Sequence, residues 1–317
     1  MIGIEIKRET DDEFFGRIAK TLNALEEIRI EKYLLLKKRL KIWAGVSLAL
    51  AGIAALLWDK FAHDNLSWMA VLPSLGVLFW AGMPWHEYKT AYGESVMPAI
   101  AKMMGFSKYD ADGRIALADL KGSKIVPYFD SCSTEDYFEG TYKGAGLRFV
   151  QAHMTRTEGS GKRRRTITVF QGLIVLISLA DPKFHGHTII ETDKSKFFEW
   201  LDSKSHGLER ANLVDPSFEK KFTVFTNDQV EARYLVDPLM MERLTHMSQS
   251  YQAKGISLAY YRDQVLILVR SSRDFFEMPP IHVSLTDPTA LTRTRRDIEE
   301  TLSMVDYLEL YKPGQAA

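Results

Sequence analysis

The sequence predicts an α+β protein in which an N-terminal two-helix transmembrane hairpin is followed by a mixed, strand-rich cytosolic domain. Two observations predict the hairpin: the runs 42–58 and 66–85 contain no charged residue, and tryptophans lie mostly near their ends. A third predicts the domain, since strand-like and helix-like segments follow the hairpin without a regular βαβ rhythm. Hydrophobic residues are 46% of the chain, which is ordinary for a folded protein of one large or two modest domains.

Residues 1–41 are expected to form a short extended start and then a cytosolic helix. Thr10 stands before three acidic residues, a pattern typical of a helix N-terminus. Apolar residues then recur at helical spacing, namely Phe15, Ile18, Leu22 and Leu25. The stripe is short for a coiled coil, so we expect it to pack on the domain while the helix continues into the first uncharged run.

The two uncharged runs are long enough to cross a thin or ordinary bilayer. As helices, Ile42–Trp58 would measure about 26 Å and Leu66–Trp85 about 30 Å. Only Asp59–Asn65 connect them, so the helices must be antiparallel and both termini must lie on one side. Positive residues directly precede the first run, namely Lys37, Lys38, Arg39 and Lys41. The positive-inside rule therefore places the termini and the main domain in the cytoplasm.

Two other interpretations of the uncharged runs are less favoured, namely a helical hairpin in a soluble core and an ion pathway. A helical hairpin buried in a soluble core would not need two charge-free segments bounded by tryptophans. No ionisable residue lies inside either run, which disfavours an ion or proton pathway through the hairpin. Gly45 and Ala49 form a small-residue pair that could pack against the second run or against a second subunit.

Residues 86–308 are assigned to the cytosolic α+β domain and 309–317 to a tail. Helices are expected at 86–106, at 194–201, from Asp237-Pro238 onward, and at 292–307. Strands are expected at 136–142, 147–153, 166–170, 173–179, 222–225, 233–236, 256–261 and 265–269. Residues 155–165 lie between two of these strands and are expected to form a hairpin tip.

Several stretches resemble an uncharacterised bacterial membrane family, domain of unknown function 3137. The longest is residues 218–244, FEKKFTVFTNDQVEARYLVDPLMMERL, and shorter ones are Glu135–Gly140 and Val169–Leu173. The resemblance covers about residues 85–308 and fits the N-terminal hairpin as well. The resemblance implies a bacterial inner-membrane protein with LemA-type membrane proteins as genomic neighbours. It assigns no activity. Asp237 stands where the family pattern leads us to expect Thr, which affects a helix cap.

The segment Asp228–Tyr234 is the first candidate binding site. Asn227-Asp228 is expected to form a turn, and Glu231 and Arg233 to share one face of a strand. Asp228, Glu231 and Arg233 could then form a structural ion-pair network or a polar binding site, and the structural role is favoured.

A basic cluster at the expected hairpin tip is the second candidate site; it comprises Lys162, Arg163, Arg164 and Arg165. The flanking glycines suggest a phosphate-binding loop, but position 156 is Arg and no Ser or Thr follows Lys162. The cluster could contact anionic headgroups or be simply solvated.

The remaining reactive side chains give weak signals. His185 and His187, with Asp181 or Glu191 nearby, could contribute metal ligands, but no second ligand pair follows at a recognised spacing. His153 on a strand is more typical of a packed imidazole than of a base. Cys132 is the single cysteine, so no internal disulfide can form.

These observations favour a membrane-anchored cytosolic binding or scaffold protein of the bacterial inner membrane, without a cofactor or metal. The formal net charge is +0, so no global field would gather nucleic acid. The expected partners are the lipid bilayer and either a LemA-type membrane protein or a second copy. The alternatives are a membrane-tethered enzyme with a polar site near Asp228–Tyr234, and a subunit of an oligomeric channel.

Overall fold

The computed structural model describes residues 11–56, 68–180, 184–192, 207–211, 218, 221–251, 253–287 and 291–308. Its helices are α1 (Asp11–Leu56), α3 (Trp68–Met103), α4 (Leu117–Lys121), α7 (Gln229–Leu235), α8 (Pro238–Ser250) and α9 (Thr292–Tyr307). Its strands are β1 (Lys108–Asp110), β2 (Ser131–Tyr142), β3 (Ala145–Glu158), β4 (Arg165–Ser178), β5 (His187–Glu191), β6 (Glu209–Arg210), β7 (Thr223–Thr226), β8 (Gly255–Tyr261) and β9 (Gln264–Arg270). The α+β class is thereby confirmed.

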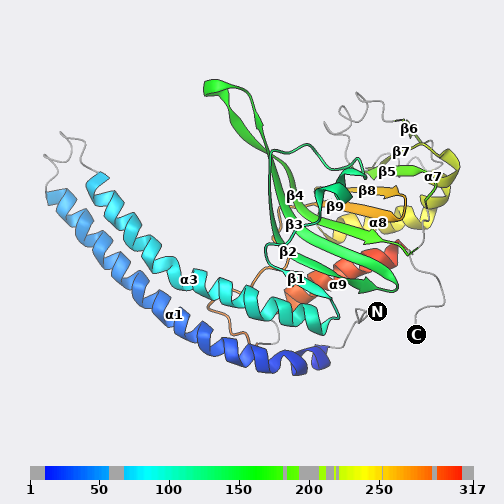
Figure 1. The fold of residues 1–317 in the computed structure, drawn as a ribbon. Coiled ribbons are helices and arrows are strands. Elements are labelled where there is room, and N and C mark those ends of the chain that lie inside the picture. Colours follow the sequence, from blue (N-terminus) through cyan, green and yellow to red (C-terminus); the bar gives the residue numbers. More distant parts are fainter. Residues whose placement is uncertain are drawn as a thin grey trace. The chain divides into compact units, whose positions relative to one another are not determined.

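The chain divides into two compact units. Of the described residues, the sheet unit contains those within 100–277 and 293–308, and the helical unit contains those within 11–99 and 278–292. Both units are shown in Figure 1.

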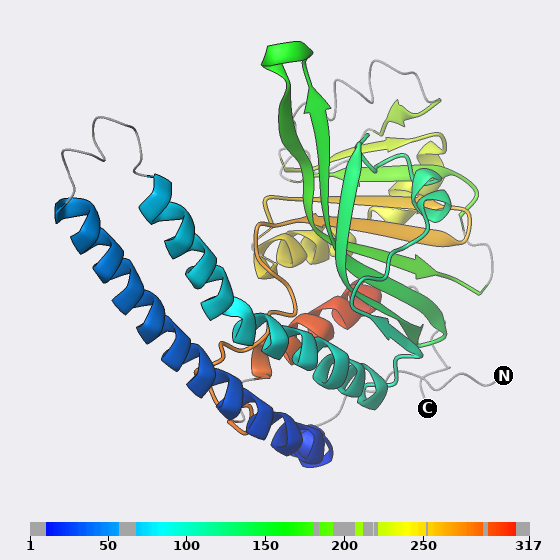
Figure 2. The same cartoon turned by 60° about the vertical axis from the view of Figure 1, so that its left-hand side comes forward.

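The sheet unit is built on one nine-stranded antiparallel sheet with the strand order β1-β2-β3-β4-β9-β8-β5-β7-β6. Residues of β8 are buried throughout, as is the interior of β9, so both faces of the central strands are covered. Figures 1 and 2 show α8 and α9 along one face. On the other face, Ile115, Leu120 and Ile125 from the α4 segment join the buried cluster of the sheet.

Turn chemistry sets the register of the hairpins. β2 and β3 are joined at Lys143-Gly144, where both φ angles are positive (50° and 78°), as a two-residue hairpin turn requires. β8 and β9 turn at Arg262, with φ 56°. The predicted hairpin at 256–269 and the predicted helix at 292–307 are therefore confirmed.

β4 differs from its prediction. The sequence suggested two strands, at 166–170 and 173–179, but the structure has one continuous strand through Gly172. Gly172 has φ 147°, and a Cβ there would lie 1.9 Å from the carbonyl oxygen of Val269. Only glycine allows the neighbouring strand to approach this closely, so Gly172 permits a close strand contact where the sequence suggested a break.

The helical unit is an antiparallel pair formed by α1 and α3 (Figure 2). Trp43 Nε1 donates to the Ser74 carbonyl at 3.1 Å, and the hydroxyls of Ser47 and Ser74 are 2.9 Å apart. Nearer the other end, Lys32 bonds Glu87 at 2.5 Å. The predicted continuation of the N-terminal helix into the first uncharged run is confirmed.

Arg39 supports α3 at one of its prolines. Pro84 has no N–H to donate to the Trp80 carbonyl one turn earlier. Arg39 Nη1 donates to that carbonyl instead, at 3.0 Å, and its guanidinium lies 4.5 Å from the centre of the Trp80 ring. A side chain of α1 thus takes the place of the missing backbone donor.

No helix in the described part of the chain combines the length and the apolar character needed to cross a membrane. The transmembrane assignment of the predicted hairpin is therefore not supported by these helices. The connecting residues 59–65, the predicted helix at 194–201 and the predicted tail lie outside the described residues.

Candidate functional site

The far ends of α1 and α3 carry uncharged and largely exposed side chains. From Ile42 to Ala55, and from Leu72 to Trp80, no described residue is buried. Leu48 is 77% exposed and Phe79 is 75% exposed. Other large exposed apolar residues in this region are Ile42, Ile53, Leu72, Leu75, Leu78, Trp80, Met83 and Trp85. We call this set the apolar hairpin surface.

The opposite ends of the same helices are different in character. Ile18, Leu22 and Leu25 of α1 are buried, as are Tyr88 and Val96 of α3. Burial of these three residues confirms that the predicted stripe is a packing face, while its packing on the main domain stays a prediction. The side chain of Phe15, the fourth residue of the stripe, lies outside the described ones.

Asp228 and Glu231 have local structural roles. Asp228 caps α7, since its side chain accepts hydrogen bonds from the N–H groups of Val230 and Glu231, both at 3.0 Å. The Glu231 carboxylate accepts from the N–H groups of His185 and Gly186, at 2.9 and 2.7 Å. The Asp228 carboxylate thus caps the start of α7, and the Glu231 carboxylate holds the loop that precedes β5.

The prediction of a strand at 233–236 was wrong. α7 is a helix over Gln229–Leu235, so Glu231 and Arg233 are not alternate residues of a strand. Arg233 is exposed beside Tyr234, which is 84% exposed. The polar site predicted from Asp228, Glu231 and Arg233 is not assembled, because Asp228 and Glu231 bind backbone N–H groups and Arg233 points to the surface.

The basic cluster lies on a two-stranded arm. β3 pairs with β2 as far as Thr155, and β4 pairs with β9 only from Gly172. Residues 156–158 and 165–171 therefore pair with each other's strand alone among the strands that the structure describes. Figure 1 shows this arm extending past the sheet. The predicted hairpin tip is confirmed, with a short 3-10 turn at Gly161–Arg163.

Glu158 neutralises part of the arm. It pairs with Arg156 at 2.5 Å and with Arg165 at 3.2 Å, and these two cations hold the pKa of its carboxyl below the usual value. Arg163 and Arg164 are exposed at the tip. Contact of the tip with anionic headgroups stays a prediction.

The histidines predicted as weak metal candidates have other contacts. The His187 ring stacks on Tyr261, with centroids 5.7 Å apart, and its Nε2 lies 2.9 Å from the Ser123 carbonyl. Glu191 accepts from the Ser257 hydroxyl at 2.6 Å and pairs with Arg270 at 3.3 Å. Asp181 lies outside the described residues. Among the described residues, no group of three or more His, Cys, Asp or Glu side chains is placed to hold a metal ion.

A polar cavity of about 290 Å³ opens where β2, β3 and β4 meet the segment after β9. Its ionisable lining residues are Glu135, His153, Arg273 and Asp274. His153 Nε2 lies 3.0 Å from the Thr168 hydroxyl, and Gln151 Nε2 donates to Asp274 at 2.8 Å. Two stretches that resemble the family, Glu135–Gly140 and Val169–Leu173, both contribute to this cavity. Sequence reasoning named His153 but did not place these residues together.

One wall of the polar cavity is fixed by a buried ion pair. Arg273 pairs with Asp297 of α9, whose other oxygen accepts the N–H of Phe276 at 3.1 Å. Burial raises the pKa of the Asp297 carboxyl, and the same effect raises that of Glu300 one turn later. The cavity has room for a small polar molecule, but Arg273 is already held by Asp297 and Asp274 by Gln151.

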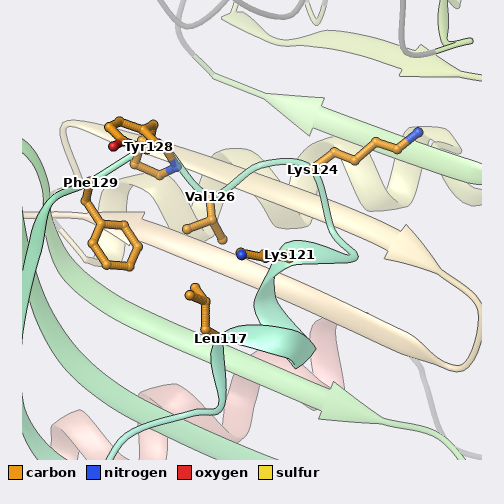
Figure 3. A pocket seen from close by; sticks show the side chains of 7 residues that line it. Leu117, Lys121, Lys124, Val126, Tyr128 and Phe129 are labelled. Carbon is orange, nitrogen blue, oxygen red and sulfur yellow. The ribbon is translucent and has the colours of Figure 1, made fainter.

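A second, more apolar cavity of about 400 Å³ lies beside α4 (Figure 3). Its lining residues are Leu117, Lys121, Lys124, Val126, Pro127, Tyr128 and Phe129. No pattern in the sequence points to this cavity, because its residues come from a short helix and an irregular segment without periodicity.

Comparisons with known proteins confirm the family resemblance. The model of the family described as "Protein of unknown function (DUF3137)" matches residues 168–310 of this chain. The match begins after Glu135–Gly140 and is shorter than the range of the resemblance seen in the sequence. A comparison with curated proteins gave no match.

Among solved structures, the crystal structure of the mycobacterial trehalose monomycolate transport factor A, TtfA, is similar at 12% identity. The alignment covers 67% of this chain and 92% of that one, with a TM-score of 0.37. At this score no shared fold or activity is inferred.

Proposed function

We propose that this chain is a membrane-anchored binding protein whose helical hairpin inserts into a bilayer and whose sheet unit binds a partner on the cytoplasmic side. The observation that carries the proposal is the apolar hairpin surface. In water, contiguous exposure of large apolar side chains would be costly, whereas in lipid it is favourable.

The arrangement of the exposed residues favours lipid over a second copy of the chain. Leu78, Phe79 and Trp80 are consecutive, and at about 100° per residue they point in three directions around α3. One protein partner would cover one face, but lipid covers a helix on all free sides. The polar groups between α1 and α3 are bonded to each other, as a bilayer requires.

The uncharged runs 42–58 and 66–85 are defined by the sequence and extend past the described ends of the helices, because residues 57–67 lie outside the described part. The basic residues at 37–41 precede the first run and support a cytoplasmic position for the sheet unit. Arg39, bonded to Trp80, belongs to this cationic boundary.

Alkaline carbonate extraction of bacterial membranes that contain the full chain tests the insertion. We expect the protein to stay in the pellet, and the double variant Leu48→Glu with Phe79→Glu to be released. Leu34→Glu is the matched control, because Leu34 is 60% exposed but lies on the other side of the basic residues. Release of the unmodified protein, or equal release of the control, would contradict insertion.

The binding role is favoured over catalysis because Asp228 and Glu231, the core of the proposed enzyme site, serve as a helix cap and a loop clamp. From the family resemblance, we propose a LemA-type membrane protein as the partner, with a second copy as the alternative. Complexes crosslinked in intact membranes are captured and identified by mass spectrometry. The result distinguishes a LemA-type partner from a second copy of the chain. Turnover of a substrate that is abolished by Arg233→Ala would overturn the binding role.

A further inference from the structure

The cavity beside α4 has the character of a site for an amphipathic molecule. Its ionisable side chains are Lys121, Lys124 and the Tyr128 phenol, and no acidic residue of the described part of the chain lines it. The remaining walls are apolar, formed by Leu117, Val126, Pro127 and Phe129. Volumes of this size, mainly apolar with a few polar groups, are typical of small-molecule sites.

The floor of the cavity is fixed by the core, while its mouth is open. Val126 and Phe129 pack against the buried cluster of the sheet. Leu117 is 43% exposed and Tyr128 is 65% exposed. Large apolar side chains are therefore left uncovered at the mouth, and a ligand that reached the floor would cover them.

Lys121 supplies the charge at this site. Figure 3 shows its amine directed toward the space between Leu117, Val126 and Phe129. The nearest acid on the same helix, Asp119, is bound by Arg148 at 2.7 Å. Among the residues that the structure describes, no ion pair of Lys121 is found.

We propose that this cavity binds a molecule with an aliphatic chain and one anionic head, a carboxylate or a phosphate monoester. The chain occupies the apolar floor and the head meets the Lys121 ammonium. Lys121 is an exposed residue, so a neutral chain would gain nothing from its ammonium, whereas an anion forms a charge-assisted bond with it. The inference names a ligand class for the binding role of the sheet unit and rests on that role, but not on membrane insertion.

A nucleotide is the competing ligand, since the cavity offers aromatic rings and cations. No side-chain amide lines the cavity, and its one side-chain hydroxyl, that of Tyr128, belongs to an exposed residue. The described lining therefore offers amine and phenol groups to a base, but no side-chain amide that could bond two positions of its edge at once. The apolar floor suits an alkyl chain better.

The test uses the full chain in phosphatidylcholine nanodiscs and a photoreactive decanoate, with crosslinked peptides mapped by mass spectrometry. We expect labelling within residues 117–129 that excess decanoate displaces. Lys121→Gln should reduce this labelling about tenfold, as the loss of one charge-assisted bond predicts. Lys254→Gln, at another exposed lysine of the sheet unit, is the matched control and should label normally.

Three further arms decide the outcome. Leu117→Trp should block labelling by filling the mouth, and circular dichroism checks that both variants fold. A neutral decanol probe should label weakly and be insensitive to Lys121→Gln. Competition between decanoate and decyl phosphate shows which anionic head binds more tightly, and either result supports the proposal. Three results would overturn the proposal. They are labelling that Lys121→Gln does not affect, equal labelling by the neutral probe, and displacement of the probe by ADP but not by decanoate.

Discussion

Glu231 joins helix α7 to the loop that precedes β5. Its two carboxylate oxygens take the N–H groups of His185 and Gly186. Gly186 allows this approach, because a Cβ there would lie 2.9 Å from a Glu231 oxygen and 2.8 Å from the Asp228 Cβ. The stability of this corner therefore depends on one carboxylate, while Arg233 on the same helix faces outward.

We predict that Glu231→Ala lowers the free energy of unfolding by about 1–1.5 kcal/mol, because it removes the acceptor of two hydrogen bonds that are partly open to water. Arg233→Ala should change it by less than about 0.5 kcal/mol, as exposed substitutions usually do. Urea denaturation of the full chain, followed by circular dichroism, measures both. An equal loss for the two variants would show that the carboxylate is not the anchor.

At the scale of elements, Glu26 of α1 holds the segment 278–287. Its carboxylate accepts from the Leu285 N–H at 2.9 Å and the Ser284 hydroxyl at 2.8 Å. Arg29 bonds the same carboxylate and also donates to the Ile281 carbonyl at 2.6 Å. The Arg29 bond is the main reason that the pKa of Glu26 falls to about 2.

The attachment of this segment should depend on pH in a defined direction. A depressed pKa means that the ionised carboxylate stabilises the folded state above pH 4.5 and that this contribution is lost as the pH falls toward about 2. We expect Glu26→Gln to reduce hydrogen-exchange protection of the Leu285 amide at pH 7 but to have little effect at pH 2.5. A variant effect that is the same at both pH values would contradict this assignment.

Elements with strong local signals were predicted well from the sequence. Apolar periodicity gave α9, and turn residues with alternation gave β8 and β9. α7 was missed, although Asp228 followed by Glu231 is a helix-start pattern, because the alternating residues around Tyr234 suggested a strand. The cavity beside α4 could not be predicted, since irregular segments meet there only through tertiary packing.

At the scale of the whole molecule, the order of the strands depends on contacts between distant parts of the chain. β4 pairs with β9, and β5 lies between β8 and β7. Local patterns predict strands but not such neighbours, so the class was predictable and the sheet order was not. The uncharged runs, in contrast, are fully visible in the sequence, and their proposed role is a property of the whole chain in a membrane.

The most direct test of the membrane account is cysteine labelling on two sides of the bilayer. Cys132, the single cysteine, is exposed in the sheet unit and serves as a natural reporter. The second reporter is Asp64→Cys, between the two runs, in a Cys132→Ser background. A membrane-impermeant maleimide applied to intact spheroplasts should label Asp64→Cys, and should label Cys132 only after lysis. Labelling of both positions only after lysis would contradict a hairpin that spans the membrane.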